Sequence, residues 1–220
     1  MKKRYSLIVA LLVTSLSGCY APQNYDNQVQ ISRTGQYQVD VDTDVVGGYF
    51  LAFKNESKVK NKPIPEQDLK KLLAGCEKEF NDVVALDAKN GKHIISSKYL
   101  GECKGHLTLK YTGNIIQEKE FNATIGSAQG DGFYIPVDFK YDVKSKQIII
   151  NSKTKADRYA LEMYGNHAYN GKLSIKTDGK VISTNSDSKP YWGLIGTYKW
   201  NTKDMTTPDA QMVISTATGG

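Results

Sequence analysis

The dominant pattern in the middle of the chain is an alternation of apolar and polar residues with a period of two. It is clearest in residues 133–143, where six apolar side chains occupy every second position. This spacing places one face of a strand in a core and the other in water. Pro136 has no amide donor, so we expect this strand to lie at an edge or to carry a bulge. Further strands are expected at 36–42, 48–53, 106–111, 118–125, 146–151 and 191–200.

Turn signals separate these segments. Asn90-Gly91 and Asp178-Gly179 each lie between β-branched runs, and both dipeptides tolerate the positive φ angles of a two-residue hairpin turn. Residues 112–114 and 144–146 resemble further turns. Strands that recur every eight to twelve residues or so are typical of an antiparallel β-sandwich or a barrel-like domain. We therefore expect a mainly β fold.

One amphipathic helix is predicted beside the sheet. Apolar residues recur at spacings of three and four from Leu69 to Val84, which gives one apolar stripe. Pro65 suits a first helical turn, and Glu66 and Asp68 place negative charge near the positive end of the helix dipole. Val83 and Val84 also fit the strand before Asn90, so we place the end of the helix near residue 81. Residues 158–164 fit either a strand or a helix, and we favour a strand.

The first 18 residues have the layout of a secretory signal peptide. Three basic residues at 2–4 precede an apolar run at 7–13 and small residues at 15–18. The apolar run is short for a permanent membrane span. The segment ends Leu16-Ser17-Gly18-Cys19, and here the chain resembles a bacterial lipoprotein precursor, whose lipobox is Leu, two small residues and Cys.

This resemblance implies that the Cys19 thiol carries a diacylglyceryl group and that the chain is cleaved before Cys19 and acylated on the new amino group. Two or three acyl chains anchor a protein durably, whereas one holds it weakly. Tyr20 follows in place of the Asp that is associated with retention at the inner membrane, so the resemblance implies the outer membrane. The orientation, periplasmic or surface-exposed, stays open. An ordinary secreted protein cut near this point is the alternative.

The rest of the chain is expected to form one domain between two polar ends. Residues 19–33 carry little periodicity, and we interpret them as the lipidated cysteine and a tether. Residues 34–200 are expected to be the single mainly β domain, and residues 201–220 a C-terminal tail, although 212–214 would suit a short strand.

Charge and cysteine content change the picture once the signal peptide is removed. The full chain has 29 Lys and Arg against 23 Asp and Glu, a net charge of +6. Residues 1–18 contain three of the basic residues and no acidic one, so the mature chain has a net charge of +3. That charge is too weak and too dispersed to indicate a nucleic-acid partner. Cys76 and Cys103 form an even pair in an oxidising compartment, which predicts a disulfide that stabilises by about 3 to 4 kcal/mol.

The sequence contains little that indicates catalysis. His93, His106 and His167 lie far apart and lack the spacing of a metal site, so neither a metal nor a cofactor is expected. The Gly-rich segment 126–132 leads into a strand, which favours a hairpin loop over a phosphate-binding loop. Asp138 and Asp142 share a strand face, but their Cα atoms would lie about 13 Å apart, too far for a glycosidase pair. We therefore expect a protein that is not an enzyme.

Aromatic residues near the C-terminus are the candidate binding residues. Tyr191, Trp192, Tyr198 and Trp200 lie in one predicted strand, and exposed rings would suit a glycan or a protein interface. The alternative is that they fill the core. The leading hypothesis is an outer-membrane lipoprotein that acts as a binding or assembly accessory for an envelope protein. The alternatives are a glycan-binding or surface-exposed interaction lipoprotein and, with less support, an envelope hydrolase.

Overall fold

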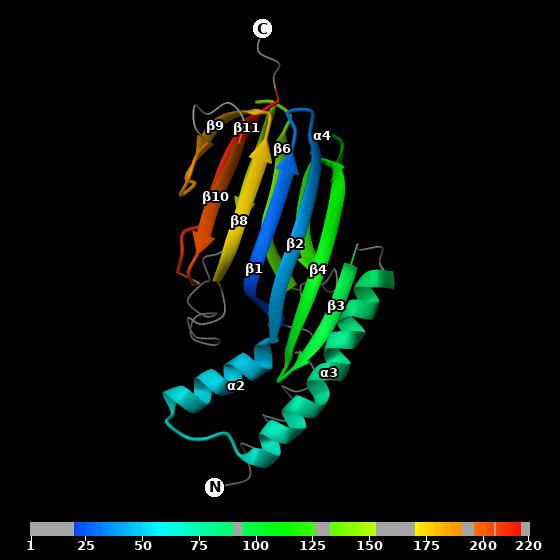
Figure 1. The fold of residues 1–220 in the computed structure, drawn as a ribbon, viewed down its shortest axis with the longest axis vertical. Coiled ribbons are helices and arrows are strands. Elements are labelled where there is room, and N and C mark those ends of the chain that lie inside the picture. The colour runs from blue at the N-terminus through cyan, green and yellow to red at the C-terminus, as the bar shows by residue number, and fades with distance from the viewer. Residues whose placement is uncertain are drawn as a thin grey trace.

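Two β-sheets packed face to face make up most of the protein; α2 and α3 lie at one end of them and the short α4 at the other (Figure 1). The computed structural model describes residues 20–89, 94–125, 133–152, 170–190, 196–204 and 206–216. Sheet A has six strands in the order β10-β8-β1-β2-β4-β3, and sheet B has five in the order β5-β6-β7-β11-β9. This arrangement confirms the predicted mainly β fold and makes it a sandwich.

The strands and helices have the following bounds. Sheet A consists of β1 Tyr20–Ile31, β2 Gln36–Gly47, β3 Ile94–Gly101, β4 Lys104–Asn114, β8 Asn170–Thr177 and β10 Gly196–Thr202. Sheet B consists of β5 Glu120–Ile125, β6 Phe133–Asp142, β7 Gln147–Ser152, β9 Lys180–Thr184 and β11 Ala210–Ser215. The helices are α2 Gly48–Val59, α3 Glu66–Lys89 and the short α4 Ile115–Glu118.

Strand β1 is central to sheet A and pairs on both sides. Its pairing with β2 is antiparallel and its pairing with β8 is parallel, so sheet A is mixed, not purely antiparallel. Side chains of β1 alternate between the core and solvent, with Tyr25, Asn27, Val29 and Ile31 buried. The segment that we expected to be a tether is therefore an interior strand, and that prediction is wrong from Tyr20 onward.

The core lies between the inner faces of the two sheets. Its largest fully buried side chains include Leu107 and Leu173 from sheet A and Phe139, Ile150 and Met212 from sheet B. Strand β11 pairs with β7 and β9 and contributes alternate side chains to this core. The predicted C-terminal tail is thus wrong over Ala210–Ser215, where the chain completes sheet B.

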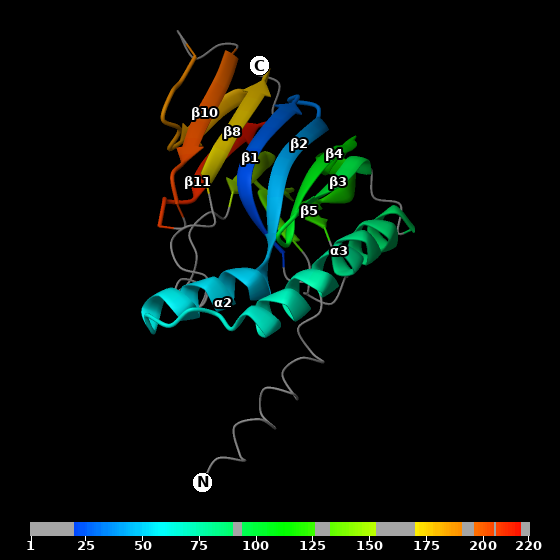
Figure 2. The same ribbon diagram turned by 60° about the horizontal axis from the view of Figure 1, so that its bottom comes forward.

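A second cluster of buried side chains lies at the helical end. Phe50 and Leu51 of α2 and Cys76 of α3 pack with Tyr25 and Val46 of sheet A. Figure 2 shows α2 and α3 lying across this end of the sheets. We call this end the helical base; it comprises α2, α3 as far as Phe80, and the turn between β3 and β4. None of the described helices is long and apolar enough to cross a membrane.

The helices differ from prediction in two places. Residues 48–53 were expected to be a strand but begin α2, because a short apolar run has no period that distinguishes a strand from a buried helical turn. The helix α3 continues to Lys89 instead of ending near residue 81, so the hairpin expected at Asn90-Gly91 does not form from residues 83–86. Val83 and Val84 instead pack against the core from the helix.

Three of the predicted turns had different outcomes. Asp178-Gly179 joins β8 of sheet A to β9 of sheet B, so it is a crossing between sheets and not a hairpin. Residues 112–113 belong to β4, whereas 144–146 form the predicted turn between β6 and β7.

The register between β5 and β6 shifts beside Pro136, as expected of a bulge. Residues 126–132 and 158–164 lie outside the described residues.

Candidate functional site

The residue that follows the predicted lipidation site is built into the helical base. Cys19 itself lies outside the described residues, but Tyr20 is the first residue of β1 and is only 4% exposed. The Tyr20 hydroxyl donates a hydrogen bond of 2.8 Å to the Cys76 carbonyl oxygen, and its ring meets Phe80 edge to face. Burial, with the negative charge of Glu79, raises the pKa of the Tyr20 hydroxyl. This hydroxyl therefore stays protonated and joins β1 to α3.

The predicted disulfide between Cys76 and Cys103 is confirmed, and it fastens α3 to sheet A. The two Cα atoms lie 5.0 Å apart. Cys103 lies in the turn between β3 and β4, where both Glu102 and Cys103 have positive φ angles of 49° and 56°. Two such residues make the type I′ hairpin turn. The Cys103 carbonyl oxygen also accepts a 2.8 Å hydrogen bond from the amide of Gly47, the residue directly before α2.

Phe80 fills the space between α3 and β4. It is 1% exposed, and a Cβ added to Gly105 would lie 2.1 Å from its ring. Only glycine lets this ring approach β4 so closely. The helical base is thus closed by a covalent bond and by tightly packed apolar groups.

The outer half of α2 and the three residues that follow it carry an excess of positive charge. From residue 54 to residue 62 the chain has four lysines and one acidic residue, Glu56, which pairs with Lys60. The Lys54 ammonium lies 4.3 Å from the centre of the Phe50 ring. Phe53 and Val59 are exposed apolar residues of the same helix, at 37% and 76%. This half of α2 is therefore both basic and partly apolar on its solvent-exposed surface.

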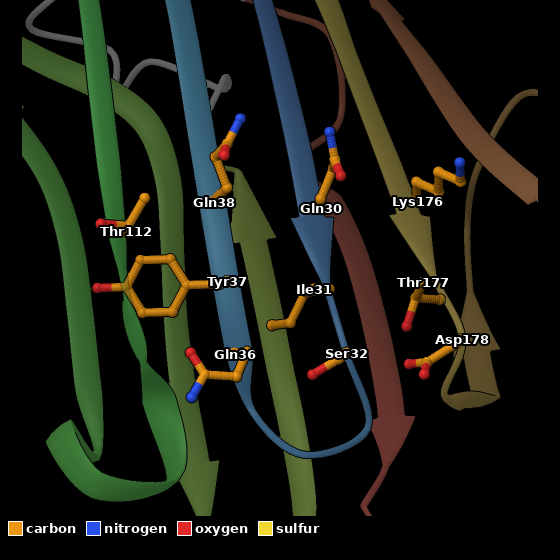
Figure 3. A pocket seen from close by; sticks show the side chains of 10 residues that line it. All are labelled: Gln30, Ile31, Ser32, Gln36, Tyr37, Gln38, Thr112, Lys176, Thr177 and Asp178. Carbon is orange, nitrogen blue, oxygen red and sulfur yellow. The ribbon is translucent and has the colours of Figure 1, made fainter.

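A polar groove lies at the opposite end of sheet A, beside the turn between β1 and β2. Its volume is about 470 Å³, and we call it the distal groove. Figure 3 shows side chains from β1, β2, β4 and β8 that line it. The register places four of them in one row across the sheet: Thr112, Gln38, Gln30 and Lys176. Amide, hydroxyl and ammonium groups in a row can exchange hydrogen bonds with a polar ligand or with a peptide backbone.

Hydrogen bonds hold the end of the sandwich beside this groove. The Tyr37 hydroxyl donates to the Glu118 carboxylate over 2.7 Å, and burial, followed by the effect of Glu118, raises the pKa of Tyr37. Asn114 caps α4, since its side-chain oxygen accepts hydrogen bonds from the amides of Ile116 and Gln117. The amide of Arg33 donates to Asp178, which ties the β1–β2 turn to the end of β8.

The predicted aromatic binding surface is not present in the described part of the chain, where its two described members are buried. Tyr198 and Trp200 lie on β10 with exposed fractions of 4% and 6%, and both belong to the core, as in the alternative interpretation. The Trp200 indole donates a hydrogen bond to the Asn185 side chain. Tyr191 and Trp192 lie outside the described residues. The residues that line the groove were missed because β1 had been interpreted as a tether.

The carboxylates and the one described histidine have structural partners. Asp138 accepts a hydrogen bond from Asn151, and Asp142 accepts two in the turn that follows it. The His106 ring lies 3.0 Å from an oxygen of Asp44 on the outer face of sheet A. No group of three or more ligating side chains able to hold a metal ion occurs in the described parts of the chain. His93 and His167 lie outside those parts.

Comparison with known proteins identifies no family for this chain. No protein-family model and no curated protein sequence matches it. Among solved structures, the folded domain of LppM from Mycobacterium tuberculosis is similar, with 9% identity and a TM-score of 0.43, over 90% of this chain and 91% of that one. An M1 zinc metallopeptidase from Deinococcus radiodurans gives 8% identity and a TM-score of 0.36, over 89% of this chain and 42% of that one. Both likenesses are too distant to carry an argument about function.

Proposed function

We propose that this chain is a lipid-anchored protein of the bacterial outer membrane that acts without catalysis, as a binding or assembly accessory of an envelope protein complex. The anchor is the lipid attached to Cys19. The signal sequence at residues 1–18 and the lipobox that ends at Cys19 support this part of the proposal.

The observation that carries the proposal is the position of Tyr20. Because Cys19 is bonded to a buried residue of β1, a lipid on Cys19 would have no flexible tether between itself and the folded domain. The helical base would then lie against the membrane. Strand β1 has twelve residues, so the distal groove would lie roughly 35 Å from the lipid attachment. The anchored domain thus presents its polar groove away from the bilayer.

A protein partner suits the groove better than a glycan does. Sugar rings bind largely by stacking on exposed aromatic side chains. Tyr198 and Trp200 are buried, and Tyr37, the aromatic residue of the groove, is only 7% exposed. The row of Gln30, Gln38 and Lys176 instead offers hydrogen bonds to a polar surface. Glycan binding is therefore the second candidate, since sugar hydroxyls can form hydrogen bonds with the same row of side chains.

Two measurements test the anchor and the partner separately. The intact mass of the mature protein should equal that of a chain starting at Cys19 with attached acyl chains, and Cys19→Ala should remove the lipid. A photo-crosslinking amino acid at Gln30, in the groove, should give one discrete adduct with an envelope protein in intact cells. The matched control is Gln211, an exposed glutamine of sheet B.

The outcomes are distinct. An unmodified N-terminus elsewhere than Cys19 would overturn the anchor. Adducts that are the same at Gln30 and Gln211, or none at Gln30, would overturn the groove as the binding surface. Loss of the Gln30 adduct when glycan fragments are added, without any protein adduct to replace it, would favour the glycan alternative.

A further inference from the structure

Helix α2 ends in a basic segment that continues beyond the helix to Lys62. Its first half is buried through Gly48, Phe50 and Leu51, but from Phe53 onward most of its side chains are exposed. Lys54, Lys58 and Lys62 are all exposed. Lys60 pairs with Glu56, and the nine residues from 54 to 62 together have a net charge of +3, from four lysines and one glutamate. The first turns of α3 add equal numbers of acidic and basic residues, so the excess belongs to the second half of α2 and to residues 60–62, which follow it.

This basic half-helix lies close to the proposed site of lipid attachment. Tyr20 is paired with Gly47, the residue directly before α2. The helix rises about 1.5 Å per residue, so Lys54 and Lys58 lie roughly 10 to 17 Å along α2 from that pair. Figure 1 and Figure 2 both show α2 at the same end of the sandwich as the start of β1.

An anionic lipid surface has the chemistry that matches this segment. Lysines within about one Debye length, roughly 8 Å, of a charged surface are attracted to it, and more distant ones are screened. Exposed apolar side chains beside lysines are typical of helices that lie in the membrane interface. Phe53 and Val59 supply such side chains, and the Lys54 ammonium lies over the Phe50 ring.

We propose that the outer half of α2 and the short segment after it dock on the anionic lipid headgroups of the membrane that holds the anchor. The contacts are made by Lys54, Lys58 and Val59 of the helix and by Lys62, which follows it. The inference rests on the proposed attachment at Cys19 for its placement. It adds a second, noncovalent contact that fixes the orientation of the domain. The anchor keeps the helical base close to the bilayer but leaves its tilt variable, whereas a second contact fixes the tilt and so the direction in which the distal groove faces.

The test measures amide hydrogen exchange of the full mature chain anchored in vesicles. One set of vesicles contains phosphatidylcholine alone, and the other contains phosphatidylcholine and phosphatidylglycerol in a two-to-one ratio. We expect exchange in peptides covering residues 53–62 to be several-fold slower in the anionic vesicles, and this protection to disappear in high salt. The triple variant Lys54→Glu, Lys58→Glu, Lys62→Glu should lose the protection.

A matched variant separates local from overall charge. Lys172→Glu, Lys180→Glu, Lys199→Glu changes the net charge equally at exposed positions of β8, β9 and β10, away from α2, and should keep the protection of residues 53–62. The neutral triple variant Lys54→Gln, Lys58→Gln, Lys62→Gln should also lose the protection. This variant introduces no negative charge, so its loss of protection would not result from a helix disrupted by charge reversal. Equal exchange in the two vesicle types, or equal loss in both charge-reversal variants, would overturn the proposal.

The anchor and the headgroup contact fail in different measurements. The intact mass of the same sample reports whether Cys19 carries lipid, while the exchange of residues 53–62 reports whether α2 meets the headgroups. A lipidated chain without headgroup-dependent protection refutes the α2 contact alone. A chain without lipid refutes the anchor.

Discussion

The helical base and the distal groove lie at opposite ends of the same strands, and different contacts hold them. At the base, a disulfide, the Phe80 ring and the buried Tyr20 fix α3 to sheet A. Near the groove, the Tyr37 hydroxyl, the Glu118 carboxylate and the Asn114 cap form the connections, and most of these groups are partly exposed. Covalent and apolar contacts are worth more than solvent-accessible hydrogen bonds.

This difference matches the roles that we propose for the two ends. An anchored end must transmit the position of the lipid to the whole domain, so a rigid junction serves it. A binding end benefits from polar groups that are exposed to solvent, because a partner can then form hydrogen bonds with them. The comparison therefore predicts that perturbing the base destabilises the protein more than perturbing the groove.

The largest expected effect is the loss of the disulfide. The double variant Cys76→Ala, Cys103→Ala should lower the free energy of unfolding by about 3.5 kcal/mol, because the bond closes a loop of 27 residues in the unfolded chain. Urea denaturation of the purified mature protein measures this change. Amide exchange should accelerate most in α3 and in the β3–β4 turn, and least at the β1–β2 turn.

Reduction of the wild-type protein is the control for this prediction, because it breaks the bond but keeps both cysteine side chains. It should reproduce most of the loss. If the reduced protein were as stable as the oxidised one, or if the groove opened before the base, the contrast between the two ends would be wrong.

A smaller effect is expected at the groove. Tyr37→Phe removes the hydroxyl that donates to Glu118 and should lower the free energy of unfolding by about 1 kcal/mol, since the bond is only partly buried. Thermal and urea denaturation measure it. Tyr141→Phe is the control, because it keeps the ring beneath the Lys119 ammonium. A loss at Tyr37 as large as that of the disulfide would remove the distinction between the ends.

Part of this comparison was predictable from the sequence. The two cysteines in an exported chain predicted the disulfide, and the stripe from Leu69 to Val84 predicted the helix that carries one of them. The alternation in residues 133–143 predicted β6. In each case a local pattern and a tertiary requirement point to the same structure.

The rest was hidden by residues that break their local pattern. Asn27 occupies an inward position of β1 and is fully buried, so an asparagine interrupts the apolar series of Tyr25, Val29 and Ile31. The strand therefore resembles a polar linker. The parallel pairing of β1 with β8 joins residues nearly 150 positions apart, as in Asn24 with Asn170, and no local pattern reports such a contact. The groove depends on this pairing, so the sequence alone could not show it.

The smallest expected effect tests whether a charge pair near the base adds to its stability. Burial alone would raise the pKa of Asp44, but hydrogen bonds from Asn24 and His106 outweigh it and hold that pKa below its usual value. A carboxyl whose pKa is lowered on folding stabilises the protein above the pKa of the unfolded chain, about 4, and loses that contribution as the pH falls through the folded value. Asp44 is partly exposed, so we expect less than about 1 kcal/mol. Asp44→Asn should cost this amount at pH near 5.5 and progressively less as the pH falls below about 4, whereas Asp26→Asn on the neighbouring strand should cost less at the higher pH. A pH-independent cost of Asp44→Asn would mean that the side chain contributes by packing and not by its charge, and that the pair of Asp44 with His106 adds nothing to the stability of the base.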